Sequence, residues 1–303
     1  MYASDRQQAE LVSIIIINYN TFKITCDCIE SIIKHTTGIP YEVIVVDNCS
    51  PTDNPDDFLI RFPSIKLIKS PVNGGFAKGN NLGIRHASGN IILLLNSDTV
   101  LTENSICKAA SFLEDNRSIG ALSVRLAYPD GKLQHTARKF RSIRNELLDL
   151  CRPLLLLLPY KSRAQLMLNQ YFKGDFNTYC DWVSGAFMMF PAALLRQLPG
   201  GKLDERFFMY GEDELWCYQF SELGHPSFYL SETTVIHIAN ASTSPEKQLK
   251  LLETIIDREL EIMAYRKGKS GYYYIFRTIF TTKELLRYYI KVAIAKMFKY
   301  RMR

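Results

Sequence analysis

The sequence of 303 residues lacks a long hydrophobic run. The longest mainly apolar stretch without a charge, Trp182–Leu195, has 14 residues and contains Gly, Ser and Pro. Because a membrane-spanning helix needs about 20 apolar residues, an ordinary span is excluded. The first ten residues also lack the apolar segment after a basic start that marks a secretory signal, so we expect none.

Paired cysteines with metal-site spacing are missing as well. The chain has seven cysteines without a CxxC pair, and Cys26 and Cys28 are too close together to form a zinc knuckle by themselves. With no secretory signal expected, reduced thiols in the cytoplasm are the plain interpretation.

Most of the chain has no excess of positive charge. Residues 272–303 hold eight Lys or Arg and one Glu, a net charge of +7, whereas the whole chain carries +6. Residues 1–271 therefore carry about −1. We expect no nucleic-acid partner, because a distributed basic face and a reader motif are both missing. The basic C-terminal segment favours an anionic membrane surface on the inner face of the cell membrane.

Apolar runs alternate with helical patterns over the first hundred residues. The continuous β-branched run Val12–Ile17 predicts a strand buried on both faces. Helical spacing follows, and the next strands are expected at Glu42–Val46, Ile65–Ile68 and Ile91–Leu95, with a helix at Gly79–Ala87. This alternation predicts an α/β fold with a mostly parallel sheet flanked by helices.

Polar residues stand where three of these strands end. They are Asn18-Tyr19-Asn20, Asp47-Asn48-Cys49-Ser50 and Asn96-Ser97-Asp98. Ligands of such sheets bind at the carboxyl ends of the strands. Asp98 suits a divalent cation that bridges phosphates, although an Asp before a helix is also a common cap.

The segment Asn73–Gly83 is rich in Gly and Asn. Flexible backbone and amides beside a helix start suit a nucleotide or phosphate, and an ordinary Gly-rich turn is the alternative. The segment is neither GxGxxG nor a P-loop.

Two features of the second half could carry chemistry. Gly211-Glu212-Asp213-Glu214 follows four residues that include three aromatics, so a general base with a raised pKa is one interpretation and an acidic helix start the other. His237 closes a short strand, Thr233–His237, and alone it is more typical of a structural histidine than of a ligand. Trp182–Pro191 has strand-like apolar sequence around Ser184-Gly185.

Two basic segments have a helical pattern. Residues 138–163 hold seven Arg or Lys around Leu154–Leu158, which indicates either a surface helix pair or a second membrane-contacting element. After a helix at Pro245–Tyr265, an apolar stripe recurs on a basic helix that either packs on the domain or lies among lipid headgroups. The stripe consists of Leu286, Tyr289, Ile290, Ala293 and Met297.

The order and spacing of seven motifs are specific. They read VSIIIINYN, VIVVDNCS, NGGFAKGNNLGI, ILLLNSDTV, WVSGAFMMF, DERFFMYGEDELWCY and VIHIANAS. Over residues 11–245, about three quarters of the chain, this series resembles the family 2 glycosyltransferases, and most closely the rhamnosyltransferase-like branch of bacterial polysaccharide synthesis. The resemblance implies a GT-A domain over residues 1–245, followed by a basic amphipathic helical region over 246–303. Within the domain it implies a nucleotide-sugar part at 11–98, a helical insertion at 138–175 and an acceptor and catalytic part at 180–245.

The resemblance also implies roles for individual residues. Asp213 would be the catalytic base, and Asp98 with His237 would hold Mg²⁺ or Mn²⁺ against the sugar diphosphate. The motif reads Asn-Ser-Asp, so Asp98 is its one carboxylate. The residues implied in donor binding are Asn18, Tyr19, Asn20, Asp47, Asn73, Gly75, Phe76, Asn80, Asn81, Asn96 and Ser97. Those implied near the sugar and the acceptor are Trp182, Ser184, Gly185 and Glu212.

The function implied is an inverting, metal-dependent transfer of a hexose or deoxyhexose, with rhamnose favoured. The donor would be a nucleotide-diphosphate sugar, and the acceptor a growing cell-surface glycan linked to a polyprenyl diphosphate. One alternative is a degenerate membrane-bound partner of an active transferase. Another is a sugar-phosphate nucleotidyltransferase, which Asn18-Tyr19-Asn20-Thr21 disfavours because that enzyme needs a Gly-rich basic loop after its first strand.

Overall fold

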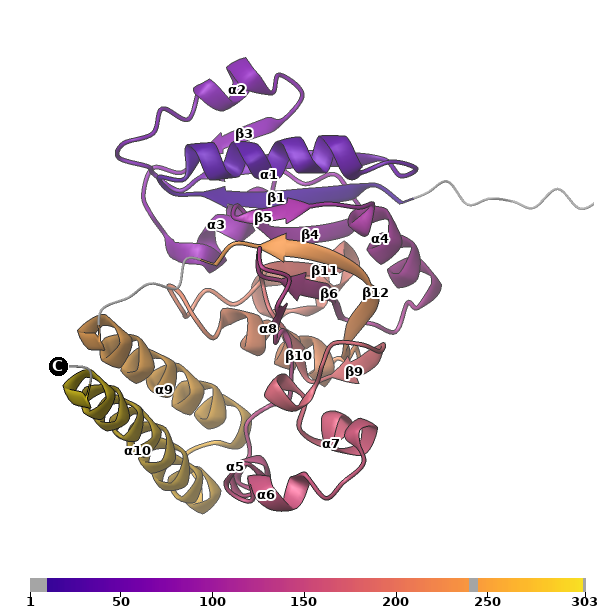
Figure 1. The fold of residues 1–303 in the computed structure, drawn as a ribbon. Coiled ribbons are helices and arrows are strands. Elements are labelled where there is room, and N and C mark those ends of the chain that lie inside the picture. Colours follow the sequence, from indigo (N-terminus) through magenta and orange to yellow (C-terminus); the bar gives the residue numbers. More distant parts are fainter. Residues whose placement is uncertain (1–9, 240–244, 302–303) are drawn as a thin grey trace, which may run out of the picture. The chain divides into compact units, whose positions relative to one another are not determined.

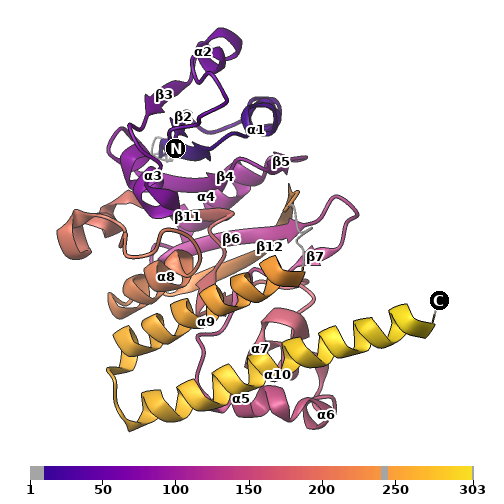
Figure 2. The same cartoon turned by 90° about the vertical axis from the view of Figure 1, so that its left-hand side faces the viewer.

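The computed structural model in Figures 1 and 2 describes residues 10–239 and 245–301. The expectation of no secretory signal falls on residues outside this range. Contacts divide the described chain into two units, residues 10–139 with 164–239 and residues 140–163 with 245–301. No helix within the described ranges is long and apolar enough to cross a membrane.

The first unit is built on one large sheet. Its strand order is β3-β2-β1-β4-β11-β6-β12-β5, with β7 beside β6 and β9 beside β12, while β8 and β10 form a separate pair. The strands are β1 (Val12–Asn18), β2 (Tyr41–Asp47), β3 (Lys66–Lys69), β4 (Ile91–Asn96), β5 (Thr99–Leu101), β6 (Ala121–Ala127), β7 (Leu133–Gln134), β8 (Ala137–Arg138), β9 (Thr178–Cys180), β10 (Trp182–Val183), β11 (Phe187–Pro191) and β12 (Ser227–His237).

The four strands expected in the first hundred residues are confirmed, and they are parallel. The ends of β1 and β2 are in register at Asn18 and Asp47, and Ile17 lies opposite Asn96 of β4. The polar residues that follow these strands therefore meet at one edge of the sheet. The predicted helix at Gly79–Ala87 begins earlier, since α3 spans Gly75–Ile84.

The expectation of a mostly parallel sheet is wrong beyond this half, because the whole sheet is mixed. β11 is antiparallel to both β4 and β6, and β5 is antiparallel to β12. An apolar run predicts a strand but does not predict its direction. An antiparallel strand also needs no crossover helix before it. The segment Trp182–Pro191 is also two strands, β10 and β11, joined by Ser184–Ala186.

The helices of the first unit cover both faces of the sheet. Alternate residues of β1 point to opposite faces. Ile14 and Ile16 pack with α1 and α4 in the main core, whereas Ile15 and Ile17 lie against glycines of α3. This two-sided burial explains the continuous β-branched run of β1. The helices are α1 (Phe22–His35), α2 (Asp57–Arg61), α3, α4 (Ser105–Asp115) and α8 (Glu212–Glu222), while α7 (Tyr160–Met167) spans the unit boundary.

The second unit consists of helices α5 (Ile143–Leu150), α6 (Arg152–Leu155), α9 (Pro245–Lys267) and α10 (Gly271–Arg301). Its core is a small cluster built mainly from α9 and α10, including Met263, Phe276 and Phe280. Lys283 of α10 is buried and pairs with Glu146 and Asp149 of α5. In the C-terminal stripe, the side chains of Leu286, Tyr289 and Ile290 are exposed, and that of Met297 lies outside the described side chains.

Gly75 allows two distant segments of the first unit to touch. Its φ is +81°, and an added Cβ would lie 2.2 Å from the carbonyl oxygen of Phe208. That carbonyl accepts a hydrogen bond from the Phe76 amide at 3.0 Å. Only glycine satisfies both the left-handed conformation and the close approach.

We expect Gly75→Ala to lower the free energy of unfolding by about 2 kcal/mol or more, because the methyl group forces the Phe208 segment away. Urea unfolding measures the change. Gly131→Ala is the matched control, since Gly131 has the same φ of +81° with nothing within 4 Å of an added Cβ. Equal losses in the two variants would show that conformation alone, and not the contact, matters.

Candidate active site

The ends of β1 and β2 are joined by a buried hydrogen-bond network. Asn18 Nδ2 donates to Asp47 Oδ1 at 2.8 Å, and the Ser50 hydroxyl donates to the same oxygen at 2.6 Å. The Ser50 amide donates to Asp47 Oδ2 at 3.1 Å. A carboxylate accepts about four hydrogen bonds, so Oδ2 keeps capacity for a ligand.

Asn48 connects this network to the Gly-rich segment. Its Nδ2 donates to Asn73 Oδ1 at 2.9 Å and to the Gly75 carbonyl at 3.2 Å, and its Oδ1 accepts from the Gly74 amide. The predicted donor-binding residues Asn73 and Gly75 thus lie beside the end of β2.

The loop after β1 projects from the same edge. Asn20 has a φ of +53°, and its Oδ1 accepts hydrogen bonds from the amide and hydroxyl of Thr52. Tyr19 is exposed, so its ring is available to a ligand. Ser97 lies at the neighbouring turn, 3.5 Å from the Thr21 hydroxyl, which donates to Asn18.

Asp98 and His237 face each other because β12 is antiparallel to β5. His237 lies opposite Thr99, and its Nε2 is 3.1 Å from Asp98 Oδ1. Asn96 Nδ2 is 3.4 Å from the same nitrogen. Burial raises the pKa of Asp98, but the hydrogen bond and charge of His237 outweigh it and leave that pKa below its usual value.

Gln134 fixes the orientation of the His237 ring. Gln134 Nε2 donates to the His237 carbonyl at 2.6 Å, which turns Oε1 toward Nδ1 at 2.7 Å. Nδ1 must therefore carry a proton, so the lone pair of the neutral ring is on Nε2 and points at Asp98. Two acceptors 3.1 Å apart need either a proton or a cation between them.

The donor set fits a divalent cation with two protein ligands. Two ligands about 2.1 Å from an octahedral ion and at right angles to each other are about 3 Å apart, close to the Asp98–His237 distance. The described residues contain no group of three or more His, Cys, Asp or Glu side chains that could hold a metal, so the remaining ligands would come from a substrate and water.

Asp213 lies beside the connection between β10 and β11. Its Oδ2 accepts from the Gly185 amide at 3.1 Å and its Oδ1 from the Glu214 amide at 2.9 Å. Burial raises the pKa of Asp213, and these amides and the charge of Arg138 only partly oppose the shift. Three residues earlier, Tyr210 has a φ of +69°, and strained backbone of this kind is common at active sites.

Asp213 and the Asp98 pair are linked through β11. The Asn96 amide donates to the Ala186 carbonyl at 3.0 Å, and Ala186 follows Gly185 directly. An added Cβ at Gly185 would lie 3.2 Å from the Phe76 ring and 3.6 Å from Cβ of Asp213. The structure therefore brings the predicted metal, donor and base residues to one edge of the sheet.

Some predicted residues face the interior of this region. Asn81 is buried and binds the backbone of Leu203, a residue that precedes the acidic motif. Its side chain donates to the Leu203 carbonyl at 2.8 Å and accepts from the Leu203 amide at 3.1 Å. Asn80 donates to the Phe76 carbonyl. The Phe76 ring stacks on Trp216 with centroids 6.2 Å apart.

The residues predicted near the acceptor lie around Gly185. The Ser184 hydroxyl accepts from the Ala186 amide, and Glu212 is buried at the start of α8. Trp182 is buried on β10, with the Arg138 guanidinium 4.8 Å from its ring centroid.

Sequence reasoning missed Gln134 and Arg138, which approach the site from β7 and β8. Both lie in a segment without a motif, Leu133–Arg138, and their partners are distant along the chain. Residues 131–140 read GKLQHTARKF, and no apolar spacing or motif in them marks Gln134 or Arg138.

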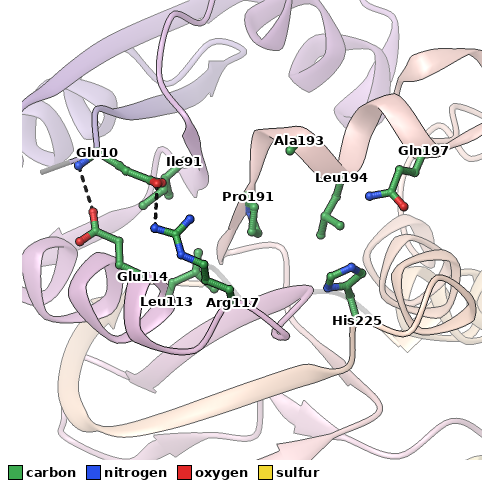
Figure 3. Close-up of a pocket in the computed structure, with 10 residues that line it drawn as sticks. All are labelled: Glu10, Ile91, Leu113, Glu114, Arg117, Pro191, Ala193, Leu194, Gln197 and His225. Carbon is green, nitrogen blue, oxygen red and sulfur yellow. Dashed lines mark hydrogen bonds and ion pairs between the residues drawn. The ribbon is translucent and has the colours of Figure 1, made fainter. Parts of the chain in front are cut away.

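A pocket at the opposite edge of the sheet is separate from this site. It is lined by Ile91 at the start of β4 and by residues that include Glu10, Glu114, Arg117 and His225 (Figure 3). Glu10 pairs with Arg117 at 3.2 Å and donates its amide to Glu114 at 3.0 Å, so these polar groups satisfy one another. None of the predicted site residues lines this pocket.

Comparison with known families matches the motifs found above. The family model "Glycosyl transferase family 2" matches residues 13–182, more than half of the chain. The chain belongs to glycosyl transferase family 2. A relative described as "Uncharacterized glycosyltransferase YwdF" from Bacillus subtilis is 29% identical over 56% of this chain and 65% of its own length. GlyG from Streptococcus pneumoniae, a glycosyltransferase, is 35% identical over 32% of this chain and 33% of its own length. The chain thus spans less than two thirds of the length of these relatives.

Solved structures of other proteins share the fold. The mannosyltransferase PcManGT from Pyrobaculum calidifontis, in complex with GDP-Man and Mn²⁺, has a TM-score of 0.59 at 15% identity and covers 92% of this chain and 70% of its own. Residues 1–349 of Staphylococcus aureus TarS with UDP-GlcNAc have a TM-score of 0.51 at 19% identity, covering 84% and 70%. At these identities the likeness shows a GT-A-like fold alone.

We expect Gln134→Ala to remove the hydrogen bond that fixes the orientation of the His237 ring. In the native protein Gln134 keeps a proton on Nδ1, and without Gln134 this preference is lost. Ring ¹⁵N chemical shifts of His237 measure this change. Gln197→Ala, at the exposed opposite edge, is the control and should leave the His237 signals in place. Identical ring signals in Gln134→Ala and the native protein would contradict the orienting role.

Proposed function

We propose that the first unit is an inverting glycosyltransferase that moves a hexose or deoxyhexose from a nucleotide-diphosphate sugar to a growing glycan. The observation that carries the proposal is that a candidate base and a candidate metal site lie at the same edge of the sheet. A carboxylate with a raised pKa, Asp213, lies one short segment away from the Asp98–His237 pair, which suits a cation.

The residues at the ends of β1 and β2 would bind the nucleoside. Asp47 is held by hydrogen bonds from Asn18 and Ser50, and Tyr19 is exposed, as stacking on a base requires. Asn73, Gly75 and Asn48 would line the next part of the donor pocket, with Asn96 and Ser97 near the diphosphate.

Asp98 and His237 would hold Mg²⁺ or Mn²⁺. When bound, such an ion neutralises the charge that develops on the leaving diphosphate. Gln134 holds the His237 lone pair toward that position, and the side chain of Asn96 lies beside the same ring nitrogen.

Asp213 would act as the general base. An acceptor hydroxyl attacks the anomeric carbon, the bond from that carbon to the diphosphate oxygen breaks, and Asp213 takes the hydroxyl proton. A single displacement of this kind inverts the anomeric centre. The raised pKa suits the task, because a more basic carboxylate accepts a proton more readily. Trp182, Ser184 and Glu212 would surround the acceptor.

Two observations favour different donor sugars. The resemblance in sequence favours rhamnose, whereas a TarS relative that is 28% identical over 35% of this chain is named as a poly(ribitol-phosphate) β-N-acetylglucosaminyltransferase. We propose a lipid-linked acceptor at an anionic membrane surface, because residues 272–303 are strongly basic and apolar side chains of α10 are exposed.

A thermal-shift panel tests the donor site. With UDP, dTDP, GDP or CMP at about a hundredfold excess over its dissociation constant, one nucleotide with Mn²⁺ should raise the melting temperature by about 5–10 °C. A dTDP response would favour rhamnose, and a UDP response an N-acetylhexosamine. Asp98→Asn should remove the Mn²⁺ dependence. A flat response to all four nucleotides would contradict the proposal.

Asp213→Asn should lower the transfer rate at least a hundredfold and change nucleotide affinity less than about twofold, because the base touches the acceptor and not the nucleotide. Radiolabelled donor measures the rate, and calorimetry the affinity. Asp130→Asn, in an exposed turn, is the matched control. Loss of nucleotide affinity in Asp213→Asn would refute the assignment as base.

The pH profile gives an independent check on Asp213. A base must be ionised, so the native rate should fall as pH decreases through the pKa of this group. Because burial raises that pKa, the fall should occur above the ordinary aspartate value of about 3.9. A rate that stays constant down to that value would show that a different group limits transfer.

A further inference from the structure

Five leucine side chains in one short segment of the second unit are about half exposed or more. Their exposed fractions run from 49% to 81%, and they lie on α5, on α6 and in the turn after α6. Exposed apolar side chains gathered in so short a segment mark a site of contact with a partner or a membrane. We name this set the leucine cluster: Leu147, Leu150, Leu154, Leu156 and Leu157.

The leucine cluster is held in a defined shape. Leu155 of α6 is only 4% exposed, so this helix has a buried side as well as an exposed one. The amides of Leu157 and Leu158 donate to the carbonyls of Leu154 and Leu155, both at 3.2 Å. The exposed leucines therefore lie on two helices and a hydrogen-bonded turn.

The acidic residues of this segment point away from the leucine cluster's solvent-facing side. Glu146 and Asp149 are buried, and both pair with Lys283 of α10. Asp149 also pairs with Arg287 at 2.6 Å. The cations Arg144 and Lys161 are exposed instead, and so is Arg152, which pairs with Asp149 at 2.9 Å. The outward surface of residues 144–161 thus combines leucine with positive charge.

We infer that the leucine cluster inserts into an anionic lipid bilayer, where its side chains enter the acyl boundary and the neighbouring cations meet the headgroups. Apolar side chains ringed by Lys and Arg are what such an interface binds. A second copy of the chain fits less well, because the same cations would face each other across a symmetric contact. The inference rests on the membrane location proposed above and adds the residues that enter the membrane.

Co-sedimentation of the full chain with vesicles tests the inference. Vesicles of mixed phosphatidylglycerol and phosphatidylcholine should bind the native protein, and phosphatidylcholine vesicles should bind it weakly. The double variant Leu156→Gln/Leu157→Gln should bind the mixed vesicles at least tenfold more weakly, since it removes two of the inserted side chains. Leu59→Gln/Ile60→Gln is the matched control, because both residues are exposed on α2 of the first unit.

A second variant reports insertion directly. The two native tryptophans, Trp182 and Trp216, are buried, so a new tryptophan gives a separable signal. In Leu157→Trp, mixed vesicles should shift the emission to the blue and brominated lipid should quench it. Ile60→Trp should show neither effect.

Several results would overturn the inference. They are unchanged binding by the double variant, absence of quenching in Leu157→Trp, equal binding to both kinds of vesicle, and a native self-association that the double variant abolishes. The nucleotide-dependent thermal shift of the double variant separates the two proposals. If that shift persists while vesicle results are negative, only the insertion fails.

Discussion

The antiparallel ladder between β4 and β11 is the constraint on which the site depends. It sets Phe187 opposite Leu95, and just beyond it the Asn96 amide bonds to the Ala186 carbonyl. This pairing fixes the turn that carries Asp98 relative to Gly185, whose amide bonds to Asp213. A shift of one residue would turn every side chain of β11 to the other face and separate these groups. The precision of the site therefore comes from backbone pairing deep in the sheet.

Strands β1, β2 and β4 were predictable because burial leaves a continuous apolar run in each of them. The place of β11 was not, since the pattern of Phe187–Pro191 shows burial and gives neither direction nor neighbour. The short pair β8 and β10 has two residues in each strand, too few for any periodic signal. The direction and the neighbours of these strands therefore depend on pairing between residues distant in the sequence, which the local pattern does not show.

In the candidate site, too, residues that stand in a motif were predictable, and residues defined by distant contacts were not. Asp98, Asp213 and His237 stand in motifs and were found as a group, and the structure brings them to one edge of the sheet. Gln134 was missed because its partner lies 103 residues away and the intervening chain has no recurring pattern. Asn81 shows the opposite case. It stands in a motif predicted to bind the donor, yet the structure buries it as a clamp on Leu203, so its polarity serves the protein's own backbone.

The late position of β11 in the chain also has a consequence for synthesis. β1, β2 and β4 are complete by residue 96, but the strand that covers the free edge of β4 begins at residue 187. At about 5–20 residues per second, a ribosome needs about 5–20 s to make the intervening chain. During that time the nascent sheet presents an apolar strand with unpaired amides and carbonyls, the kind of edge to which other chains add. The strand that completes the site is therefore also the one that ends this exposure.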